Sequence, residues 1–479
     1  MNGDWLRLKG FNEECGVFAA VGVPHAAEVV ALGLHALQHR GQEATGVVAL
    51  GEDGRFAVVK GIGLVSDVYR GGRLDAIGGT MAIGHNRYST AGGLTLENTQ
   101  PLRVVYRGGE LALAHNGNLT NAREVRQGLE GSGSIFQTTL DTEVFLHLIA
   151  LASAENVEEA LVEAAQQVQG AYSLVLLTPE RVVALRDPHG FRPLCIGRLG
   201  DGYVVSSETC ALDLVGAELL REVAPGELLV LDAKGLRSRQ ALPAAQPAQH
   251  CIFEHIYFSR PDSVVFGETV DRVRRRLGHA LAKEHPVEAD VVISVPDSSN
   301  SIALGYSEAS GLPYELGLIR NHYVGRTFIQ PQQKGRDFGV RVKFNPVREI
   351  LEGRRIVVVD DSIVRGTTSR KLVRLLRGAG AREVHFRVGS PPVTHPCFYG
   401  IDTPSRGELI GATRTVEEIR QYLSVDTLGY ISLDGLLSAE RDPRSYCRSC
   451  FTGRYPVAVD PGARKLSIEE QRRTTGAGR

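Results

Sequence analysis

The sequence has no excess of charge of either sign. Lysine and arginine together number 54, and aspartate and glutamate number 55, which gives a formal net charge of −1. A protein that binds nucleic acid or a membrane surface over a broad area usually carries a basic excess. We therefore expect no nucleic-acid or membrane partner, and any site for a polyanion must be local.

Long apolar runs, a signal sequence and a dense set of cysteines are absent as well. The longest apolar runs, such as the one that ends at Val359, are far too short to span a bilayer. The first ten residues lack the apolar core of a secretory signal. Seven cysteines in a chain of 479 residues do not make a disulfide scaffold. We expect a cytoplasmic protein in which thiols serve as nucleophiles, metal ligands or buried filler.

The sequence does contain apolar material for more than one core. Hydrophobic residues make up 43% of the chain, and a chain of this length suggests about two to four domains. The clearest change of composition is the uncharged stretch 242–249, LPAAQPAQ, which is rich in Pro, Ala and Gln. We place the main domain boundary there, near residue 245.

Strand and helix patterns differ on the two sides of this boundary. Before it, short β-type runs alternate with helical runs, which predicts layered sheets with covering helices. After it, apolar β-branched runs at 290–295, 355–359 and 383–388 alternate with helical runs at 301–309 and 369–377, which predicts βαβ units around a buried parallel sheet. The N-terminal strands are expected at 16–21, 45–50, 55–59, 111–114, 172–177 and 181–185, and the helices at 26–37, 142–152 and 157–168.

The sharpest local feature is the segment 357–370, VVVDDSIVRGTTSR. Asp360 and Asp361 follow a β-branched run, at the edge where open α/β sheets bind ligands. Gly366 then allows close approach of the backbone, and the free N–H groups of a helix start favour an anion. We infer a phosphate cradle whose carboxylates bind sugar hydroxyls or a divalent cation. The alternative is a strand end with solvated aspartates and a capped helix. The absence of a Walker A pattern argues against a P-loop nucleotidase.

Two further segments suit the same site. Residues 296–299, PDSS, also lie between a strand and a helix, and their hydroxyl groups suit a pyrophosphate or its metal ion. Taken alone, that turn would be an ordinary N-cap. Residues 323–345 are expected to form a mobile basic lid that closes over a polyphosphate and excludes water, with a solvated surface loop as the alternative. This segment sets one acid, Asp337, against five basic residues: Arg326, Lys334, Arg336, Arg341 and Lys343.

Cys15 directly precedes a strand-like run, and the fourteen residues before it look dispensable. If residues 1–14 are a propeptide, Cys15 becomes the first residue of the mature chain. Its α-amino group, with a reference pKa of about 7.7–8.0, can then take the proton of its own thiol. The alternative is a buried cysteine in a strand.

Five motifs that follow one another in the N-terminal part carry a resemblance to a known family. They are CGVFA at Cys15, LQHRGQEATG (37–46), GHNRYSTAG (84–92), AHNGNLTN (114–121) and LDTEV (140–144). Together they resemble the class II glutamine amidotransferase domain of the N-terminal nucleophile hydrolases. The DD–RGTT segment resembles the phosphoribosyl-pyrophosphate motif of type I phosphoribosyltransferases. Both halves together, from about Cys15 to about Pro456, resemble the glutamine phosphoribosylpyrophosphate amidotransferase (amidophosphoribosyltransferase) family.

The resemblance implies a fold and an activity. The fold is α/β, with an αββα sandwich over 15–245 and a phosphoribosyltransferase domain with a parallel sheet over 246–459, flanked by a propeptide (1–14) and a flexible tail (460–479). Glutamine would be hydrolysed to glutamate, and the ammonia would pass through an internal channel to phosphoribosyl pyrophosphate (PRPP). Pyrophosphate would leave and 5-phosphoribosylamine would form, the committed step of purine nucleotide synthesis. The family also implies a homotetramer and feedback inhibition by purine nucleotides.

The resemblance assigns roles to five residues of the first site. Cys15 would be the nucleophile, and Arg87 would bind the α-carboxylate of glutamine, for which a guanidinium fork is suited. Asn116 and Gly117 would form the oxyanion hole, and Asp141 would hold the α-ammonium group. The alternative for Arg87 and Asp141 is a surface ion pair.

In the second site, the resemblance places Asp360 and Asp361 on the ribose hydroxyls and on Mg²⁺, and Ser298 beside the metal and the pyrophosphate. Magnesium would neutralise the leaving pyrophosphate. The lid would contribute basic side chains such as Arg326, Arg336 and Lys343. The remaining contacts to PRPP, chiefly to its 5-phosphate, would come from Ser362, Arg365, Gly366, Thr367 and Thr368.

Four cysteines lie after the domain boundary: Cys251, Cys397, Cys447 and Cys450. Their spacing does not choose between core packing, a Cys₄ zinc site and an iron–sulfur cluster. The resemblance does choose, because one branch of the family carries a [4Fe–4S] cluster on four such cysteines together with a cleaved propeptide. The cluster would pin the C-terminal tail to the phosphoribosyl domain and would make the protein sensitive to oxygen. Cys195 and Cys210 lie outside this pattern and are expected to be structural.

Two other functions compete with this interpretation. A different class II amidotransferase, such as a hexosamine-phosphate synthase, would need a sugar-isomerase domain in place of the DD–RGTT segment. A non-catalytic PRPP sensor that regulates transcription would need a DNA-binding module with a basic face, which the sequence does not indicate.

Overall fold

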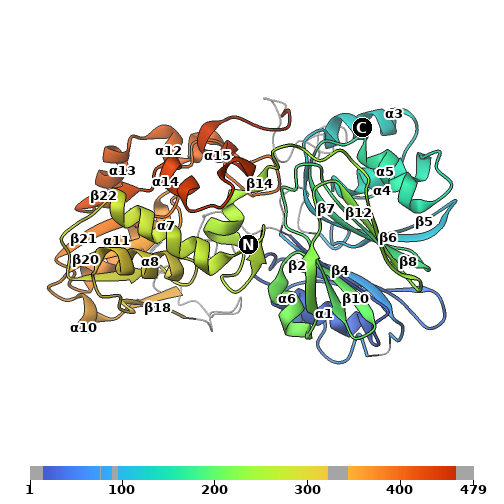
Figure 1. Cartoon of the computed structure of the whole chain (residues 1–479), viewed down its shortest axis with the longest axis horizontal. Helices are drawn as coiled ribbons and strands as arrows, with labels where there is room; N and C mark the ends of the chain where they lie inside the picture. The colour runs from blue at the N-terminus through green and yellow to red at the C-terminus, as the bar shows by residue number, and fades with distance from the viewer. Residues whose placement is uncertain (1–14, 76, 89–94, 322–342, 460–479) are drawn as a thin grey trace, which may run out of the picture.

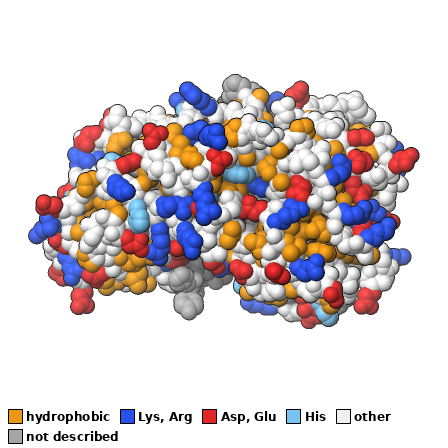
Figure 2. Space-filling model, in the orientation of Figure 1, with side chains coloured by type: hydrophobic (Ala, Val, Ile, Leu, Met, Phe, Trp, Pro, Cys, Tyr) orange, Lys and Arg blue, Asp and Glu red, His pale blue; other side chains and the backbone are white. Residues whose placement is uncertain are grey.

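The chain forms two lobes that lie side by side, the first drawn blue to green and the second yellow to red in Figure 1. The predicted propeptide and tail lie outside the residues described here. No helix in the described part of the chain is long and apolar enough to cross a membrane. Acidic and basic side chains are interspersed over the face seen in Figure 2. The computed structural model describes residues 15–75, 77–88, 95–321 and 343–459.

The N-terminal lobe holds two antiparallel sheets. The strands of the first sheet are β1 (Gly16–Val21), β2 (Ala44–Leu50), β3 (Phe56–Ile62), β4 (Met81–Arg87), β9 (Cys195–Leu199), β10 (Gly202–Ser206) and β11 (Glu218–Glu222). They neighbour one another in the order β11-β9-β10-β1-β4-β2-β3. The strands of the second sheet are β5 (Leu102–Tyr106), β6 (Gly109–Leu119), β7 (Gly170–Leu177), β8 (Arg181–Arg186), β12 (Glu227–Asp232) and β13 (Gly235–Gln240). Their order is β13-β12-β8-β7-β6-β5.

Alternation of side chains along the strands builds four layers in this lobe. Val17 of β1 points into a core shared with the second sheet, whereas its neighbour Phe18 packs on the opposite face against helices. The helices over the first sheet are α1 (Ala26–Ala36) and α6 (Thr209–Val215), and those over the second are α3 (Ala122–Gly131), α4 (Thr142–Leu151) and α5 (Val157–Ala165). The predicted αββα sandwich is confirmed.

The C-terminal lobe is built around a parallel sheet of four strands: β17 (Val291–Ser294), β20 (Arg355–Asp360), β21 (Glu383–Val388) and β22 (Thr427–Tyr430). Val357 and Val358 of β20 face opposite sides of this sheet, and both sides are covered, as a parallel sheet requires. The helices on the Val357 side are α7 (Val270–Glu284), α8 (Asn300–Ser310) and α14 (Leu433–Ser438), and those on the Val358 side are α11 (Thr367–Gly378) and α13 (Val416–Leu423). The predicted parallel sheet is therefore confirmed.

Shorter elements complete the two lobes. Strand β14 (His250–Cys251) pairs in parallel with β23 (Tyr446–Cys447). Two antiparallel pairs join β15 (Val264–Val265) to β16 (Glu268–Thr269) and β18 (Leu318–Arg320) to β19 (Phe344–Pro346). The remaining helices are α2 (Val65–Val68), α10 (Arg348–Leu351), α12 (Ile410–Thr413), α15 (Ser449–Thr452), the π-helix η1 (Glu254–Phe258) and the 3₁₀ helices η2 (Arg406–Glu408) and η3 (Pro443–Ser445).

Several predicted elements lie where the sequence places them, and some differ in length. Strands β1 and β21 coincide with the predicted strands at 16–21 and 383–388, while α5 ends three residues before the predicted helix end at 168. The predicted strand 111–114 is too short, since β6 continues through the polar AHNGN motif to Leu119. Asn116 and Gly117 therefore belong to a strand.

Candidate active sites and a cysteine pocket

Cys15 lies at the start of β1, where β1 runs antiparallel to β4 and Gly16 stands opposite Asn86. Cys15 is only 7% exposed, and its thiol donates to the carbonyl oxygen of Tyr88 at 3.6 Å. Arg87, the last residue of β4, ends at the same edge of the first sheet. The expected nucleophile and the expected carboxylate-binding residue are thus on adjacent strand ends.

Arg87 is buried and connected to the segment that carries Asp141. Its Nη1 donates to the carbonyl oxygen of Asn98. The side-chain amide of Asn98 donates to Thr139 Oγ1 at 3.0 Å, and the backbone N–H of Thr139 donates to Asn98 Oδ1 at 3.1 Å. Asn98 therefore joins the end of β4 to the start of α4. The sequence motifs do not single out Asn98, because nothing in its neighbourhood marks it as a bridge.

Asp141 is the N-cap of α4 and is 6% exposed. Its Oδ1 accepts from the backbone N–H of Thr142 at 2.9 Å, and its Oδ2 accepts from the backbone N–H of Leu119, at the end of β6, also at 2.9 Å. A capping carboxylate is favoured at a helix start. Both Asp141 and Arg87 are buried, so the alternative that they form a surface ion pair is wrong.

Asn116 and Gly117 lie in β6, next to this cap. The side-chain nitrogen of Asn116 is buried and has no hydrogen-bond partner among the described residues. A buried donor without a partner costs about 1–3 kcal/mol, so a fold that keeps one needs a reason for it. Gly117 has φ of 147°, and a Cβ there would lie 2.0 Å from the carbonyl oxygen of Ala171. Only glycine fits this position. The neighbouring Asn116 amide is a donor suited to a bound acceptor.

The two sheets are joined beside these residues. Burial lowers the pKa of His85 on β4 to about 3, so its ring is neutral and its Nε2–H donates to the carbonyl oxygen of His115 on β6 at 3.1 Å. The backbone N–H of His115 donates in turn to Gln100 Oε1 at 2.7 Å. The His85–His115 bond holds β4 and β6 together, two residues from Arg87 and directly before Asn116. The residues expected to bind glutamine therefore gather at one end of the sandwich.

The second site forms where β20 ends. Asp361 is 6% exposed, and its Oδ2 accepts from Ser298 Oγ at 2.5 Å while its Oδ1 accepts from Ser362 Oγ at 2.6 Å. Asp360 Oδ1 accepts from the backbone N–H of Asp361 at 3.0 Å and from Ser299 Oγ at 3.3 Å. The structure thus brings the PDSS loop and the aspartate pair into direct contact, as the sequence predicts.

The carboxylates of Asp360 and Asp361 need a counter-ion when both are charged. Burial and the charge of Asp361 raise the pKa of Asp360 well above its usual range, and burial also raises the pKa of Asp361. Two adjacent carboxylates, of which that of Asp361 is buried, repel each other, and a divalent cation with oxygen ligands would offset that repulsion. The donor set of Asp360, Asp361 and Ser298 is chemically suited to Mg²⁺.

The expected phosphate cradle follows the aspartates. Ile363 and Val364 are buried beneath the turn, and Gly366, with φ of 70°, is the N-cap of α11. Thr367 is exposed at the first turn of this helix. The side chain of Arg365 is held by Glu408, with Nη2 to Oε1 at 3.0 Å. The backbone at the helix start, more than the Arg365 side chain, is therefore available for a phosphate.

The expected lid lies mostly outside the described residues, including Arg326 and Arg336. Lys343 is described, and its carbonyl oxygen accepts from the backbone N–H of Asn321 at 2.8 Å. Arg320 of β18 pairs with Asp297 of the PDSS loop at 2.9 Å. The β18–β19 pair therefore anchors both flanks of that segment beside the second site.

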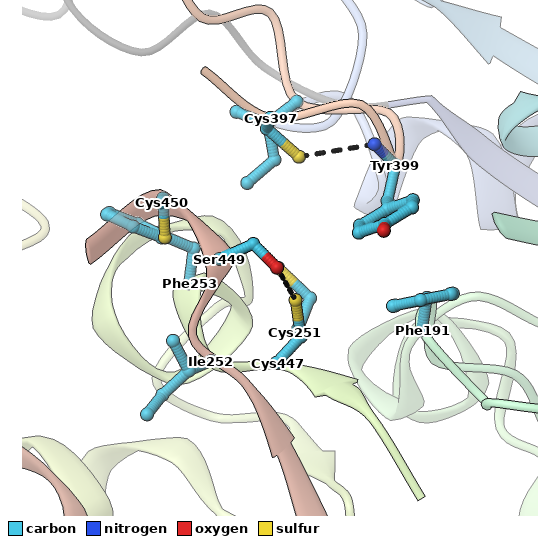
Figure 3. Close-up of a pocket in the computed structure, with 10 residues that line it drawn as sticks. Phe191, Cys251, Ile252, Phe253, Cys397, Tyr399, Cys447, Ser449 and Cys450 are labelled. Carbon is cyan, nitrogen blue, oxygen red and sulfur yellow. Dashed lines mark hydrogen bonds between the residues drawn. The ribbon is translucent and has the colours of Figure 1, made fainter. Parts of the chain in front are cut away.

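The four cysteines after the domain boundary line one small cavity of about 20 Å³. Figure 3 shows them around it, together with apolar side chains such as Phe253. Two of the cysteines stand opposite each other in the β14–β23 pair, and the cavity walls contain almost no polar surface. The four are Cys251, Cys397, Cys447 and Cys450.

The cavity suits a sulfur-ligated group in its chemistry. Burial raises the pKa of Cys447 to about 11, and burial also raises the pKa of Cys450. The backbone N–H of Tyr399 donates to Cys397 Sγ at 3.3 Å, the kind of contact that supports a ligating thiolate. Among the described residues, which include all seven cysteines, no disulfide forms and no set of three or more ligands stands at metal-binding geometry. An all-thiol donor set suits an iron–sulfur cluster or zinc.

Known proteins resemble this chain over most of its length. A glutamine amidotransferase domain family matches residues 85–214. The chain is 54% identical over 447 residues to amidophosphoribosyltransferase 1, chloroplastic, of Arabidopsis thaliana, covering 93% of this chain and 79% of that protein. It is 51% identical over 458 residues to the amidophosphoribosyltransferase of Bacillus subtilis, covering 94% and 96%.

Solved structures give the same result. The glutamine PRPP amidotransferase of B. subtilis, complexed with ADP and GMP, superposes with a TM-score of 0.89 at 49% identity, covering 95% of this chain and 100% of that one. A second structure, described as the allosteric regulatory enzyme of purine biosynthesis, has a TM-score of 0.90 at 49% identity and covers 95% and 99%. With identities of 49–54% over 93–95% of its length, the chain belongs to the amidophosphoribosyltransferase family.

Proposed function

We propose that this chain transfers the amide nitrogen of glutamine to PRPP, releasing glutamate, pyrophosphate and 5-phosphoribosylamine, at the first committed step of purine nucleotide synthesis. The proposal rests on two features of one chain: the side-chain amide of Asn116, buried and without a hydrogen-bond partner among the described residues, and the adjacent aspartates before a helix start, of which Asp361 is buried. The first suits a developing oxyanion, and the second suits a cation and a sugar phosphate.

In the first site, Cys15 acts as the nucleophile once residues 1–14 have been removed. Its α-amino group takes the thiol proton, and the thiolate forms a C–S bond to the amide carbon of glutamine. The oxyanion accepts from the Asn116 amide and the Gly117 backbone N–H. The α-ammonium group of Cys15 then returns the proton to the amide nitrogen, the C–N bond breaks and ammonia leaves, and water hydrolyses the thioester to glutamate. Arg87 and Asp141 hold the α-carboxylate and the α-ammonium group, since their charges match.

In the second site, ammonia attacks the anomeric carbon of PRPP, the C–O bond to pyrophosphate breaks, and the amine loses a proton. Asp360 and Asp361 orient the ribose hydroxyls, while the helix start at Gly366–Thr368 holds the 5-phosphate. Asp360, Asp361 and Ser298 would hold Mg²⁺, which would neutralise the leaving pyrophosphate when bound. The lid, with Arg326, Arg336 and Lys343, excludes water from the site.

We also propose that the four cysteines of the cavity hold a [4Fe–4S] cluster that joins the C-terminal segment to the second lobe. The all-thiol, apolar lining supports it. A Cys₄ zinc site is the alternative, and iron and acid-labile sulfide distinguish the two.

Further properties follow from the family as proposals. The domains are 15–245 and 246–459, the enzyme is a cytoplasmic homotetramer, and ammonia passes between the sites through an internal channel. Purine nucleotides are its feedback inhibitors, which the nucleotides bound to the B. subtilis relative support.

The test uses glutamine labelled with ¹⁵N in the amide, with PRPP and Mg²⁺. We expect one pyrophosphate and one glutamate per ¹⁵N-phosphoribosylamine, trapped as a stable derivative. Unlabelled product, or glutamate without pyrophosphate, would contradict the proposal.

A further inference from the structure

A buried chain of hydrogen bonds closes the base of the PDSS loop in the second lobe. Ser294, the last residue of β17, precedes the loop, and Asn300, the first residue of α8, follows it. Ser294 Oγ donates to Asn300 Oδ1 at 2.7 Å. One side-chain contact therefore joins the two ends of the loop.

A third side chain completes this chain of hydrogen bonds. The hydroxyl groups of Tyr314 and Ser294 lie 3.0 Å apart. A serine hydroxyl has one proton, and Ser294 gives it to the amide oxygen of Asn300, so Tyr314 is the donor to Ser294. Hydrogen bonds that are linked in this way polarise and strengthen one another. These three residues, Ser294, Asn300 and Tyr314, form what we call the loop brace.

The brace is anchored on the parallel sheet. Ser294 is 4% exposed and ends a strand, VVIS, that is otherwise apolar. A hydroxyl in such a place is unfavourable unless it is hydrogen-bonded. The backbone on both sides of Tyr314 is bonded to β17, since the N–H of Val292 donates to the carbonyl oxygen of Pro313 at 2.8 Å and the N–H of Glu315 donates to that of Val292 at 3.0 Å. The Tyr314 hydroxyl is therefore presented from a fixed backbone.

The brace also contacts the part of the loop that carries Ser298. The backbone N–H of Asn300 donates to the carbonyl oxygen of Asp297, the residue before Ser298, at 3.3 Å. Ser298 Oγ in turn donates to Asp361 Oδ2 at 2.5 Å. A shift of Asn300 would therefore move Ser298 relative to Asp361.

The outer side of the loop is held less firmly. Asp297 pairs with Arg320 at 2.9 Å, but both side chains are 48% exposed. Exposed ion pairs usually contribute little, because water and salt screen them. The buried brace is therefore the stronger constraint on the loop.

We propose that Ser294, Asn300 and Tyr314 are positioning residues for the pyrophosphate end of PRPP. The inference rests on the proposed function and adds to it residues that act through Ser298. A loop without its brace populates other conformations, and the apparent affinity of a ligand falls with the fraction of the loop in the binding conformation.

The brace acts on one end of the substrate only. The proposed 5-phosphate cradle opens α11, which covers the Val358 side of the parallel sheet, whereas α8 covers the Val357 side. Loss of the brace should therefore weaken the binding of pyrophosphate and leave the binding of the sugar phosphate nearly unchanged.

The test measures the binding of two fragments of PRPP to the full-length protein by calorimetry: inorganic pyrophosphate with Mg²⁺, and ribose 5-phosphate. Tyr314→Phe removes one hydroxyl, and Ser294→Ala breaks both side-chain hydrogen bonds of the brace. We expect pyrophosphate to bind about threefold more weakly to Tyr314→Phe and about tenfold more weakly to Ser294→Ala, the range that hydrogen bonds of this kind represent. The affinity for ribose 5-phosphate should stay within about twofold of the parent, because distant sites behave independently.

Tyr306→Phe is the matched control. Tyr306 lies in the same helix as Asn300, and its hydroxyl donates to the carbonyl oxygen of His285 at 2.9 Å, outside the loop; both affinities of this variant should equal those of the parent. Tyr314→Phe alone decides if Ser294→Ala does not fold. Equal weakening of both fragments, or parent-like pyrophosphate binding in the folded variants, overturns the inference. A parent that binds neither fragment would overturn the proposed function instead.

Discussion

Gly400, in the loop that carries Cys397, lies directly against Gly117 of β6: a Cβ added to Gly400 would come within 3.2 Å of the Gly117 Cα. The side-chain amide of Asn118 donates to the carbonyl oxygen of Phe398 at 2.9 Å in the same contact. The loop 397–400 of the second lobe thus packs against β6, the strand that carries the proposed oxyanion hole.

Gly400→Ala should therefore impair the use of glutamine more than the use of ammonia. Gly400 has φ of 110°, so an alanine is strained there and also presses on Gly117. Strain of this kind costs about 1–3 kcal/mol, and we expect glutamine-dependent turnover to fall about tenfold, the factor that about 1.4 kcal/mol represents. Ammonium-dependent turnover should stay within about twofold.

The matched control for this variant is Gly407→Ala, because a Cβ at that position meets no atom within 4 Å. Steady-state rates with each nitrogen donor decide the matter. Equal losses with glutamine and with ammonium in Gly400→Ala would mean that the contact serves stability alone.

Asp361→Ala should impair product formation from both nitrogen donors. The change removes the acceptor of Ser298 and Ser362 and one of the two carboxylates of the proposed cation site. Loss of a supporting group at a metal site already costs about 10- to 100-fold, so a fall of at least that size is expected. Glutamine hydrolysis without PRPP, measured as glutamate release, should persist. Normal pyrophosphate release in this variant would remove the aspartate pair from the mechanism.

Cys447→Ala should lower both the iron and the acid-labile sulfide content of anaerobically purified protein and also its Tm. Cys447 lines the cavity and is half-buried, while Cys195 is buried in β9 of the first lobe, outside the cavity, and provides the control as Cys195→Ala. Metal and sulfide analysis, with thermal unfolding, checks both variants. Zinc without sulfide in the parent would replace the cluster by a Cys₄ zinc site, and undiminished iron in Cys447→Ala would exclude Cys447 as a ligand.

A buried histidine should make stability depend on pH. His255 Nε2 donates to the carbonyl oxygen of Val265 at 2.9 Å, and Nδ1 donates to Glu440 at 2.9 Å, so the ring is an imidazolium. Burial alone would lower the pKa of His255, but the charge and hydrogen bond of Glu440 raise it above its usual value. Since the folded pKa is raised, this stabilisation is complete below the unfolded pKa of about 6.5 and is lost as pH rises through the folded pKa.

Glu440→Gln should remove that pH dependence. Breaking a buried pair costs about 3–5 kcal/mol, so Tm at pH 6 should fall, and the decline of Tm above about pH 6.5 should flatten relative to the parent. Thermal unfolding from pH 6 to 9 measures both effects. Parallel Tm curves for parent and variant would show that the His255–Glu440 pair does not titrate in this range.

The sequence predicts the second site well because its signal is local. The aspartate pair, the RGTT turn and the PDSS loop each follow an apolar strand, and the carboxyl ends of parallel strands meet at one edge of the sheet. That Ser298 contacts Asp361 therefore follows from the βαβ pattern.

The first site is harder to predict, because its strands lack the alternation of apolar and polar residues that is typical of a strand. In β4 every residue of MAIGHNR is buried, including His85, Asn86 and Arg87, so the polar half of the strand lacks the alternating apolar pattern. The AHNGN segment of β6 also lacks the alternating pattern, with His115 and Asn116 buried side by side. By contrast, α7 has apolar residues at Val270, Val273, Leu277 and Leu281, a helical spacing that is plain in the sequence.

Contacts between the lobes have no signal in the local sequence. Arg40 of the first lobe donates from Nη2 to Glu254 of the second lobe, although 214 residues separate them along the chain. The sequence around neither residue indicates this contact. Neither hydrophobic period nor turn chemistry can pair them, because the pairing depends on how two separately folded lobes dock. The Gly400–Gly117 contact is of the same kind.

The central claim is that Cys15 frees the nitrogen that the aspartate pair delivers to the sugar. The most direct measurement compares pyrophosphate release by Cys15→Ala with glutamine and with ammonium as nitrogen donors, alongside the intact mass of the parent. We predict a parent that begins at Cys15, no release with glutamine in the variant, and release with ammonium within about twofold of the parent, as expected for chemically separate sites. Full glutamine-dependent release by Cys15→Ala, or by a parent that retains Met1, would contradict the account.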